Sequence, residues 1–220
     1  MSTPLPDVLS GVVFDLDGTL VDSSQDLTRA LNVVLRANGC EPVDVQQVRD
    51  WVGQGARHMI SRALEYRGAD VDHDVYPAFR AAYMATLTQD TRTYPGITRL
   101  LAGLRRRGVP IAVCTNKPFE PAMKLIVELG LSVMLDAVVG GDSLDVKKPA
   151  PEPVALALQK IGVRPEGAVM IGDSVADMGA GDAAGLATIG VSWGYGDCSG
   201  ATRVVDTVDA LTELLLPESG

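Results

Sequence analysis

Short, wholly apolar segments alternate along the chain with longer segments whose apolar residues recur every three or four positions. A short apolar run is typical of a strand buried on both faces of a parallel sheet, and the longer recurrence is typical of an amphipathic helix. The runs with the strand pattern are residues 12–14, 110–114, 137–139, 168–171 and 187–191. Helical patterns lie before, between and after the last four of these strands, at residues 97–107, 121–129, 152–161, 175–184 and 208–216. This alternation predicts an α/β fold in which helices cover both faces of a parallel sheet.

The chain between the first and second strands has a different character. From about residue 23 to residue 89 it shows helical patterns and no strand pattern. Ser23 and Asp26 have the spacing of a capping box at the start of the first helix, and Asp44 is a candidate N-cap for the second. Because the first strand belongs to the sheet, this helical block is predicted to be an insertion within the sheet-forming part.

The composition limits the partners that this chain can have. Its 220 residues carry a net charge of −9, which argues against nucleic acid or an anionic membrane, because both bind basic patches. A phosphorylated small molecule stays possible, because a few local cations and a metal ion can dominate a site. The three cysteines, Cys40, Cys114 and Cys198, form no CxxC pair and are typical of reduced thiols. With no signal-peptide pattern and no membrane-spanning apolar run, we expect a cytoplasmic protein.

Two carboxylates, Asp15 and Asp17, directly follow the first strand. As residues i and i+2 of an extended backbone, they should point to the same side. Two like charges held close together need a neutralising cation or a shared proton, and Mg²⁺ prefers carboxylate oxygens. The alternative is a polar Asp-Gly turn at the strand end, because Gly18 follows. On this stretch alone, both interpretations stay open.

Polar residues also follow three other predicted strands. They are Thr115, Asn116 and Lys117 after the second strand, Asp142 and Lys148 after the third, and Asp173, Ser174 and Asp177 after the fourth. Taken singly, each has a structural explanation, such as a helix cap at 115–116 or a solvated lysine at 148. Ligands of open parallel sheets bind beyond the carboxyl ends of the strands. Carboxylates, a hydroxyl, an amide and a lysine converging there predict a phosphoryl-transfer site.

The carboxylates suit the two steps of phosphate ester hydrolysis. Asp15 is expected to attack phosphorus and form an aspartyl-phosphate. Asp17 is expected to protonate the leaving oxygen and then to take a proton from the hydrolytic water. We expect Mg²⁺ to be held by Asp15 and Asp173 and supported by Asp177, so that it offsets the repulsion between phosphate and nucleophile.

Neutral and basic groups are expected to bind the phosphate itself. Thr115 and Asn116 would donate hydrogen bonds to its oxygens, and Lys148 would add a positive charge. His58 and His73 are isolated in the sequence and belong to no metal-ligand pattern, so zinc is not expected.

The segment Phe14–Leu20, with the sequence FDLDGTL, resembles the first motif of the haloacid dehalogenase superfamily. Thr115, the pair Lys148–Pro149 and the segment Gly172–Asp177 resemble its second, third and fourth motifs in order and spacing. The resemblance extends over essentially the whole chain. The four motifs together make a chance match improbable.

This resemblance implies a particular architecture and a particular metal site. It implies a Rossmann-like, doubly wound core made of residues 1–21 and 92–220, with an inserted α-helical cap domain at residues 22–91. It also implies that the main-chain carbonyl of Asp17 joins Asp15 and Asp173 around the Mg²⁺.

Within the superfamily, the chain is most similar to the phosphoglycolate phosphatases. The residues that carry this likeness are Trp51–Gly55, Tyr94–Gly96, Thr115–Pro118 and Gly140–Ser143. The likeness implies hydrolysis of 2-phosphoglycolate, or of another small phosphorylated metabolite, by a monomer or homodimer. A cap that closes over the site would exclude bulk water and large substrates. Among the cap residues we expect Arg57, with Gln54 beside it, to face the substrate, although a solvated arginine is the alternative.

Other activities on the same scaffold stay open. They are a sugar-phosphate phosphatase (including one for N-acetylmuramate 6-phosphate), a pyrophosphatase, a β-phosphoglucomutase-like enzyme and a dehalogenase. Thr19 argues against the mutase, which usually has Val or Ile there, and Asp17 argues against the dehalogenase, which needs no general acid. From a different class, a non-catalytic phospho-aspartate signalling module is disfavoured by the large insertion after Asp15.

Overall fold

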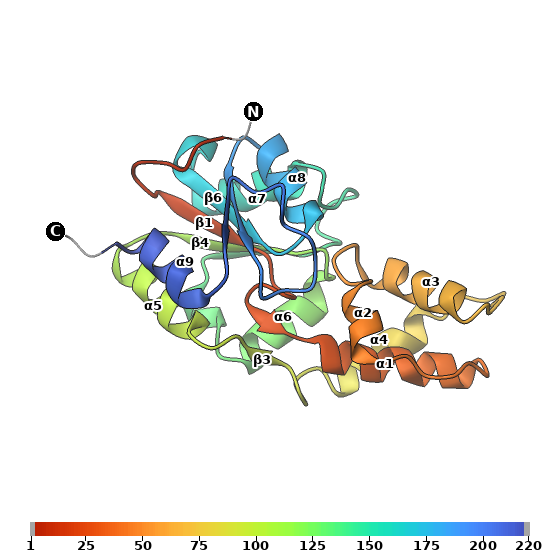
Figure 1. The fold of residues 1–220 in the computed structure, drawn as a ribbon. Helices are drawn as coiled ribbons and strands as arrows, with labels where there is room; N and C mark the ends of the chain where they lie inside the picture. Colours follow the sequence, from red (N-terminus) through yellow and green to blue (C-terminus); the bar gives the residue numbers. More distant parts are fainter. Residues whose placement is uncertain (1–2, 218–220) are drawn as a thin grey trace.

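The structure, a computed structural model, describes residues 3–217, and a six-stranded parallel sheet forms the centre of this part. Its strands are β1 (Gly11–Phe14), β4 (Ile111–Cys114), β5 (Ala137–Val139), β6 (Ala168–Gly172), β7 (Ala187–Val191) and β8 (Arg203–Val205). They lie in the order β5-β4-β1-β6-β7-β8, so the strand order reverses at β1 (Figure 1). Rossmann-like doubly wound sheets have this order and bind their ligands where it reverses. The predicted fold class is confirmed.

Helices cover both faces of the sheet. On one face lie α7 (Glu152–Ile161) and α8 (Val175–Ala183), and on the other lie α5 (Ile97–Arg106), α6 (Phe119–Glu128) and α9 (Val208–Leu215) (Figure 1). The side chain of Val13 in β1 belongs to the first layer, whereas Val12 and Phe14 belong to the second. All three are fully buried, which explains why this strand has an unbroken apolar run.

The edge strand β8 was missed by the sequence pattern. Its residues Arg203 and Val204 are exposed and only Val205 is buried, so that it has no apolar run. It pairs with β7 alone. Two further short elements, the 3-10 turns Ser132–Met134 and Pro165–Gly167, join strands and helices of the core.

The predicted helical insertion contains α1 (Ser24–Ala37), α2 (Val45–Arg49), α3 (Ala56–Tyr66) and α4 (Tyr76–Ala85). These helices form a group beside the sheet (Figure 1). A short antiparallel ribbon of β2 (Val21–Asp22) and β3 (Arg92–Thr93) joins this group to the core. The ribbon lies at the limits expected for the cap domain, residues 22–91, and this domain division stays our prediction. Every helix within residues 3–217 is too short or too polar to span a membrane.

The capping box predicted at the start of α1 is wrong. Ser23 precedes the helix, but its hydroxyl donates to Asp17 Oδ1 at 2.5 Å and does not cap the helix. Asp26 accepts hydrogen bonds from the main-chain N–H and the hydroxyl of Thr91, at 2.8 and 2.7 Å. Both side chains therefore serve tertiary contacts at the two connections between core and insertion. A residue spacing read from the sequence gives no sign of these partners, of which Thr91 lies 65 residues from Asp26.

Candidate active site

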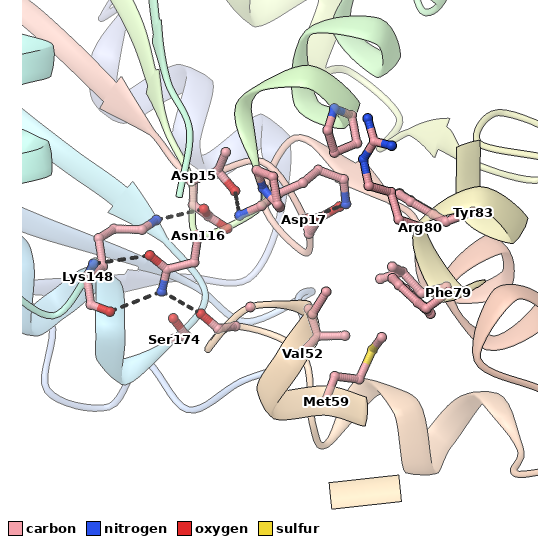
Figure 2. A pocket seen from close by; sticks show the side chains of 18 of the residues that line it. Asp15, Asp17, Val52, Met59, Phe79, Arg80, Tyr83, Asn116, Lys148 and Ser174 are labelled. Carbon is pink, nitrogen blue, oxygen red and sulfur yellow. Dashed lines mark hydrogen bonds and ion pairs between the residues drawn. The ribbon is translucent and has the colours of Figure 1, made fainter. Parts of the chain in front are cut away.

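The polar residues that follow the strands meet at one edge of the sheet, as predicted. Asp15 follows β1, Lys148 lies in the loop after β5, and Asp177 lies in the first turn of α8 after β6. Lys148 Nζ donates to Asp15 Oδ1 at 2.7 Å (Figure 2). It also donates to Asp177 Oδ1 at 2.5 Å. Three segments far apart in the sequence thus share one ammonium group. All three side chains are buried.

Lys148 is the structural centre of this charge cluster. Its ammonium also donates to the main-chain carbonyl of Cys114 at 2.5 Å, so all three of its N–H groups have oxygen acceptors. Burial disfavours its charge, but the carboxylates of Asp15 and Asp177 outweigh burial and raise the pKa of Lys148 above its usual range. Lys148 is therefore a permanent positive charge next to the candidate nucleophile, not a solvated surface lysine.

Three carboxylates are gathered closely enough to share one cation. Single oxygens of Asp15, Asp173 and Asp177 all lie within 4.8 Å of one another. Burial, together with the negative charges of Asp177 and Asp173, raises the pKa of Asp15 to about 8 in spite of Lys148. Burial and the charge of Asp177 raise the pKa of Asp173 to about 6. A hard divalent cation would offset this repulsion, so the donor set fits Mg²⁺.

Asp173 is held in place by a loop whose role the sequence did not reveal. Its Oδ2 accepts the main-chain N–H groups of Tyr195 and Gly196, at 2.7 and 3.2 Å, and its Oδ1 accepts the hydroxyl of Thr19 at 3.1 Å. A Cβ at Gly194 would lie 2.2 Å from the Cβ of Asp173. The glycines of residues 193–196 therefore allow the backbone to approach the carboxylate closely, and this explains the glycine-rich pattern there.

The two expected phosphate donors of the second motif are used differently. The Asn116 side-chain amide donates to the carbonyls of Gly53 and Lys148, at 2.8 and 3.0 Å (Figure 2). It is therefore not free to bind phosphate, contrary to the simplest reading of the motif. Within residues 3–217 its main-chain N–H has no acceptor in a hydrogen bond, so that group is the candidate phosphate donor. The hydroxyl of Thr115 accepts the N–H of Lys117 at 3.2 Å and keeps its own hydrogen to donate.

Lys117 is a site residue to which the sequence analysis assigned no role. Its ammonium donates to both oxygens of Asp17, at 2.8 and 2.7 Å, and lies 4.8 Å from the ring centroid of Tyr83. Lys117 and Tyr83 are 7% and 3% exposed. The available sign in the sequence that Lys117 belongs to the site was its position directly after Thr115 and Asn116. Nothing local indicated that it would turn toward Asp17.

The cap side of the cavity is largely apolar. Val52, Met59 and Phe79 line it opposite the polar edge of the sheet (Figure 2). Arg80 is the cap cation on the cavity wall, and it forms an ion pair with Glu120 of the core helix α6. The free volume is about 60 Å³, room for a few water molecules. Only a small substrate can therefore lie between core and cap in this arrangement.

The structure does not bring the two expected cap residues to the cavity. The side chain of Arg57 is 64% exposed, pairs with Asp74 at 2.9 Å and stacks on Tyr76. Gln54 is exposed, and neither it nor Arg57 lines the cavity. One face of α3 packs into the core through Met59 and Ala63. Arg57 lies outside this face and therefore points outward. The alternative interpretation of Arg57, a solvated arginine on a helix, describes its position in this structure.

Comparison with known proteins gives a consistent result. The family model of haloacid dehalogenase-like hydrolases matches residues 12–191. A phosphoglycolate phosphatase of Chromobacterium violaceum is 37% identical over 214 residues, which cover 94% of this chain and 96% of the relative. One of Rhodospirillum rubrum is 38% identical over 222 residues, covering 95% and 92%. The crystal structure of CbbY from Rhodobacter sphaeroides in complex with phosphate has a TM-score of 0.81 at 28% identity and covers 93% of this chain and 96% of that one.

Proposed function

The chain belongs to the haloacid dehalogenase-like hydrolase family and is a phosphoric monoester hydrolase, and from that premise we propose that it hydrolyses 2-phosphoglycolate with the help of Mg²⁺. The reaction passes through an aspartyl-phosphate on Asp15. The observation that carries this proposal is the contact of Lys148 with Asp15, beside the carboxylates of Asp173 and Asp177. The names of the relatives support the substrate.

The phosphate group binds among donors at the sheet edge. Lys148, the hydroxyl of Thr115 and the main-chain N–H of Asn116 surround the side chain of Asp15 and favour a dianion there. Lys148 contacts only Oδ1 of Asp15, which leaves Oδ2 to approach phosphorus. The carboxylates of Asp15 and Asp173 would hold Mg²⁺, with Asp177 in support. The family resemblance adds the main-chain carbonyl of Asp17. The ion would keep the nucleophile ionised and reduce its repulsion from the phosphate.

Two displacements at phosphorus complete the reaction. Asp15 attacks phosphorus, the bond to the ester oxygen breaks, and Asp17 donates a proton to that oxygen as glycolate leaves. A water molecule then attacks the aspartyl-phosphate and transfers a proton to Asp17. The bond between phosphorus and Asp15 breaks, and inorganic phosphate leaves with the nucleophile restored. Helices α1, α3 and α4 limit the access of bulk water to both steps.

The test is phosphate release from a panel of small esters, with Mg²⁺ and with EDTA. The panel contains 2-phosphoglycolate, hexose phosphates, N-acetylmuramate 6-phosphate and pyrophosphate. We expect turnover that depends on Mg²⁺, with 2-phosphoglycolate far ahead. A different leading ester would overturn the substrate alone. Full activity in EDTA would overturn the proposed metal, and no release from any ester would overturn the proposed hydrolysis.

The sequence-based expectations about the cell and the assembly belong to this proposal too. We propose a cytoplasmic enzyme that acts as a monomer or homodimer on a small phosphorylated metabolite, without nucleic acid or membrane as a partner. The free thiols of Cys40, Cys114 and Cys198 and the acidic composition support this assignment.

A further inference from the structure

The hydroxyl of Tyr83 is a buried polar group that the mechanism does not use. Tyr83 comes from α4 of the insertion, lines the cavity and is 3% exposed. Within residues 3–217 its hydroxyl has no hydrogen-bond partner. Buried hydroxyls nearly always have one, because leaving water without a replacement bond is unfavourable. A hydroxyl that lines a cavity without a partner points to a ligand group that would complete its hydrogen bonding.

The neighbouring ammonium of Lys117 also has one N–H group that is not used in a hydrogen bond among the described residues. Two of its three N–H groups can serve the oxygens of Asp17, and within residues 3–217 the third has no oxygen acceptor at hydrogen-bond distance, the neighbouring hydroxyl of Tyr83 included. The usual pKa values of a lysine ammonium and a tyrosine hydroxyl both lie about three units above neutral pH. Both groups therefore keep their protons at neutral pH. A donor pair of this kind selects an acceptor, and preferably an anion.

The position of this pair restricts the ligand. Lys117 and Tyr83 share one small cavity with Asp15 and Thr115, where the phosphate is expected. The rest of the cap wall is apolar, apart from Tyr76 and from Arg80, which already pairs with Glu120. An anionic group that reaches the pair must therefore be joined to the phosphate through a very short chain.

We propose that Lys117 and Tyr83 form a subsite for a second anionic group of the substrate, the carboxylate of a short phosphorylated acid. The inference rests on the proposed phosphatase function and assigns the groups that distinguish 2-phosphoglycolate from an uncharged ester of the same size. The carboxylate shares Lys117 with Asp17, which loosens the bidentate contact and frees an oxygen of Asp17 to carry the proton that Asp17 gives to the leaving oxygen. An ester without this carboxylate leaves Lys117 fully engaged with Asp17, so that discrimination affects kcat as well as KM.

Binding of non-hydrolysable analogues tests the subsite without turnover. 3-Phosphonopropionate carries the carboxylate, and propylphosphonate replaces it by a methyl group. With the wild-type protein and Mg²⁺, calorimetry should show the first binding about tenfold to 100-fold more tightly. Tyr83→Phe keeps the ring and its packing, and should reduce this ratio about tenfold by weakening only the carboxylated analogue. Lys117→Met should abolish the ratio, and circular dichroism checks that this variant is folded.

A matched control comes from the same cap. Tyr66 is 56% exposed and does not line the cavity, so Tyr66→Phe should leave the ratio unchanged. Equal ratios in the wild type, Tyr83→Phe and Tyr66→Phe would overturn the subsite, because Tyr83→Phe causes no folding problem that could hide an effect. Equal binding of both analogues to the wild type would overturn it as well.

Turnover separates this inference from the proposed function. The ratio of kcat/KM for 2-phosphoglycolate to that for ethyl phosphate should fall at least about tenfold in Tyr83→Phe. If the wild type prefers 2-phosphoglycolate and Tyr83→Phe keeps the whole preference, the function stands and the subsite is wrong. If no ester is hydrolysed but the binding ratio still depends on Tyr83, the subsite stands and the proposed function is wrong.

Discussion

The two ends of the cavity are built in opposite ways. At the core end, every described charged side chain has a charged or main-chain partner within hydrogen-bond distance, as Lys148 has in Asp15 and Asp177. At the cap end the wall is apolar at Val52, Met59 and Phe79, and a buried hydroxyl on Tyr83 has no partner within residues 3–217 (Figure 2). The core end resembles a finished reaction centre. The cap end resembles a binding surface that a ligand completes.

This difference separates chemistry from substrate choice. Phosphoryl transfer needs the same few charges whatever the ester, and rigid strand ends hold them with little freedom. Selection among esters depends on the group beyond the ester oxygen, which the proposed function directs toward the helical insertion. Changes at the core end, apart from Lys117 of the proposed subsite, should therefore reduce all activities together, whereas changes at the cap end should alter the ratios between substrates.

The largest effect is expected from Asp15→Asn at the core end. The amide is a poor nucleophile, so that turnover of every ester should fall about 10⁴-fold or more, to the detection limit. Phosphate release and acid-quench trapping of a phosphorylated protein measure the two consequences. The amide has nearly the same shape, so the variant should still bind 3-phosphonopropionate. An active variant, with contaminating phosphatases excluded, would contradict the assignment of Asp15 as nucleophile.

A smaller effect is expected from Gly194→Ala, which acts on Asp173, a ligand of the proposed metal site. Its Cβ would clash with the Cβ of Asp173 and displace the carboxylate. The Mg²⁺ concentration for half-maximal activity should rise about tenfold to 100-fold for all esters alike. The control is Gly200→Ala in the same loop region, where an added Cβ meets nothing within 4 Å. Equal metal requirements in the two variants would remove the loop from the metal site.

A several-fold effect is expected from the cap cation on the cavity wall. Arg80→Ala removes a partly exposed charge and should raise KM for 2-phosphoglycolate about twofold to fivefold, with less effect on ethyl phosphate. Arg57→Ala is the matched comparison, because this arginine lies on the same insertion but outside the cavity. It should change KM by less than about twofold. The reverse outcome would restore the expectation that Arg57 faces the substrate.

The smallest effect concerns stability at the cap end. Tyr83→Phe removes a buried hydroxyl that has no partner among the described residues, so the free energy of unfolding of the ligand-free protein should rise by about 1 kcal/mol. Thermal unfolding should show a Tm about 2–4 °C higher. Tyr66→Phe, which changes an exposed ring, should show no such gain. A clear loss of stability in Tyr83→Phe would mean that the hydroxyl already has a partner, and would weaken the proposed subsite.

Most of the sheet could be predicted because a strand that is buried on both faces has an unbroken run of apolar residues in the sequence. β1, β4 and β6 are unbroken apolar runs, and the residues that follow them reach the same edge in any parallel sheet. Asp15 and Asp173 could therefore be named without coordinates. The edge strand β8 has no such apolar run, because two of its three residues are exposed.

The contacts at the insertion could not be predicted in the same way. Helical periodicity placed α1, α3 and α4, but it does not tell which end of a helix faces the core or how far the helix is rotated. Arg57 was therefore expected to face the substrate, whereas the structure has Arg80 and Tyr83 on the cavity wall. The hydroxyl of Ser23 was expected to cap α1, and instead it binds Asp17.

The sequence by itself determined the parallel sheet, the inserted helices and the carboxylates and lysine at the strand ends, because each depends on a neighbour only a few residues away. Tertiary structure alone decided that Lys117 binds Asp17, that residues 193–196 hold Asp173, and that Tyr83 is buried without a partner. The first two contacts join residues 100 and 22 positions apart in the sequence. Their geometry depends on how whole elements pack, and no local pattern of polar and apolar residues encodes it.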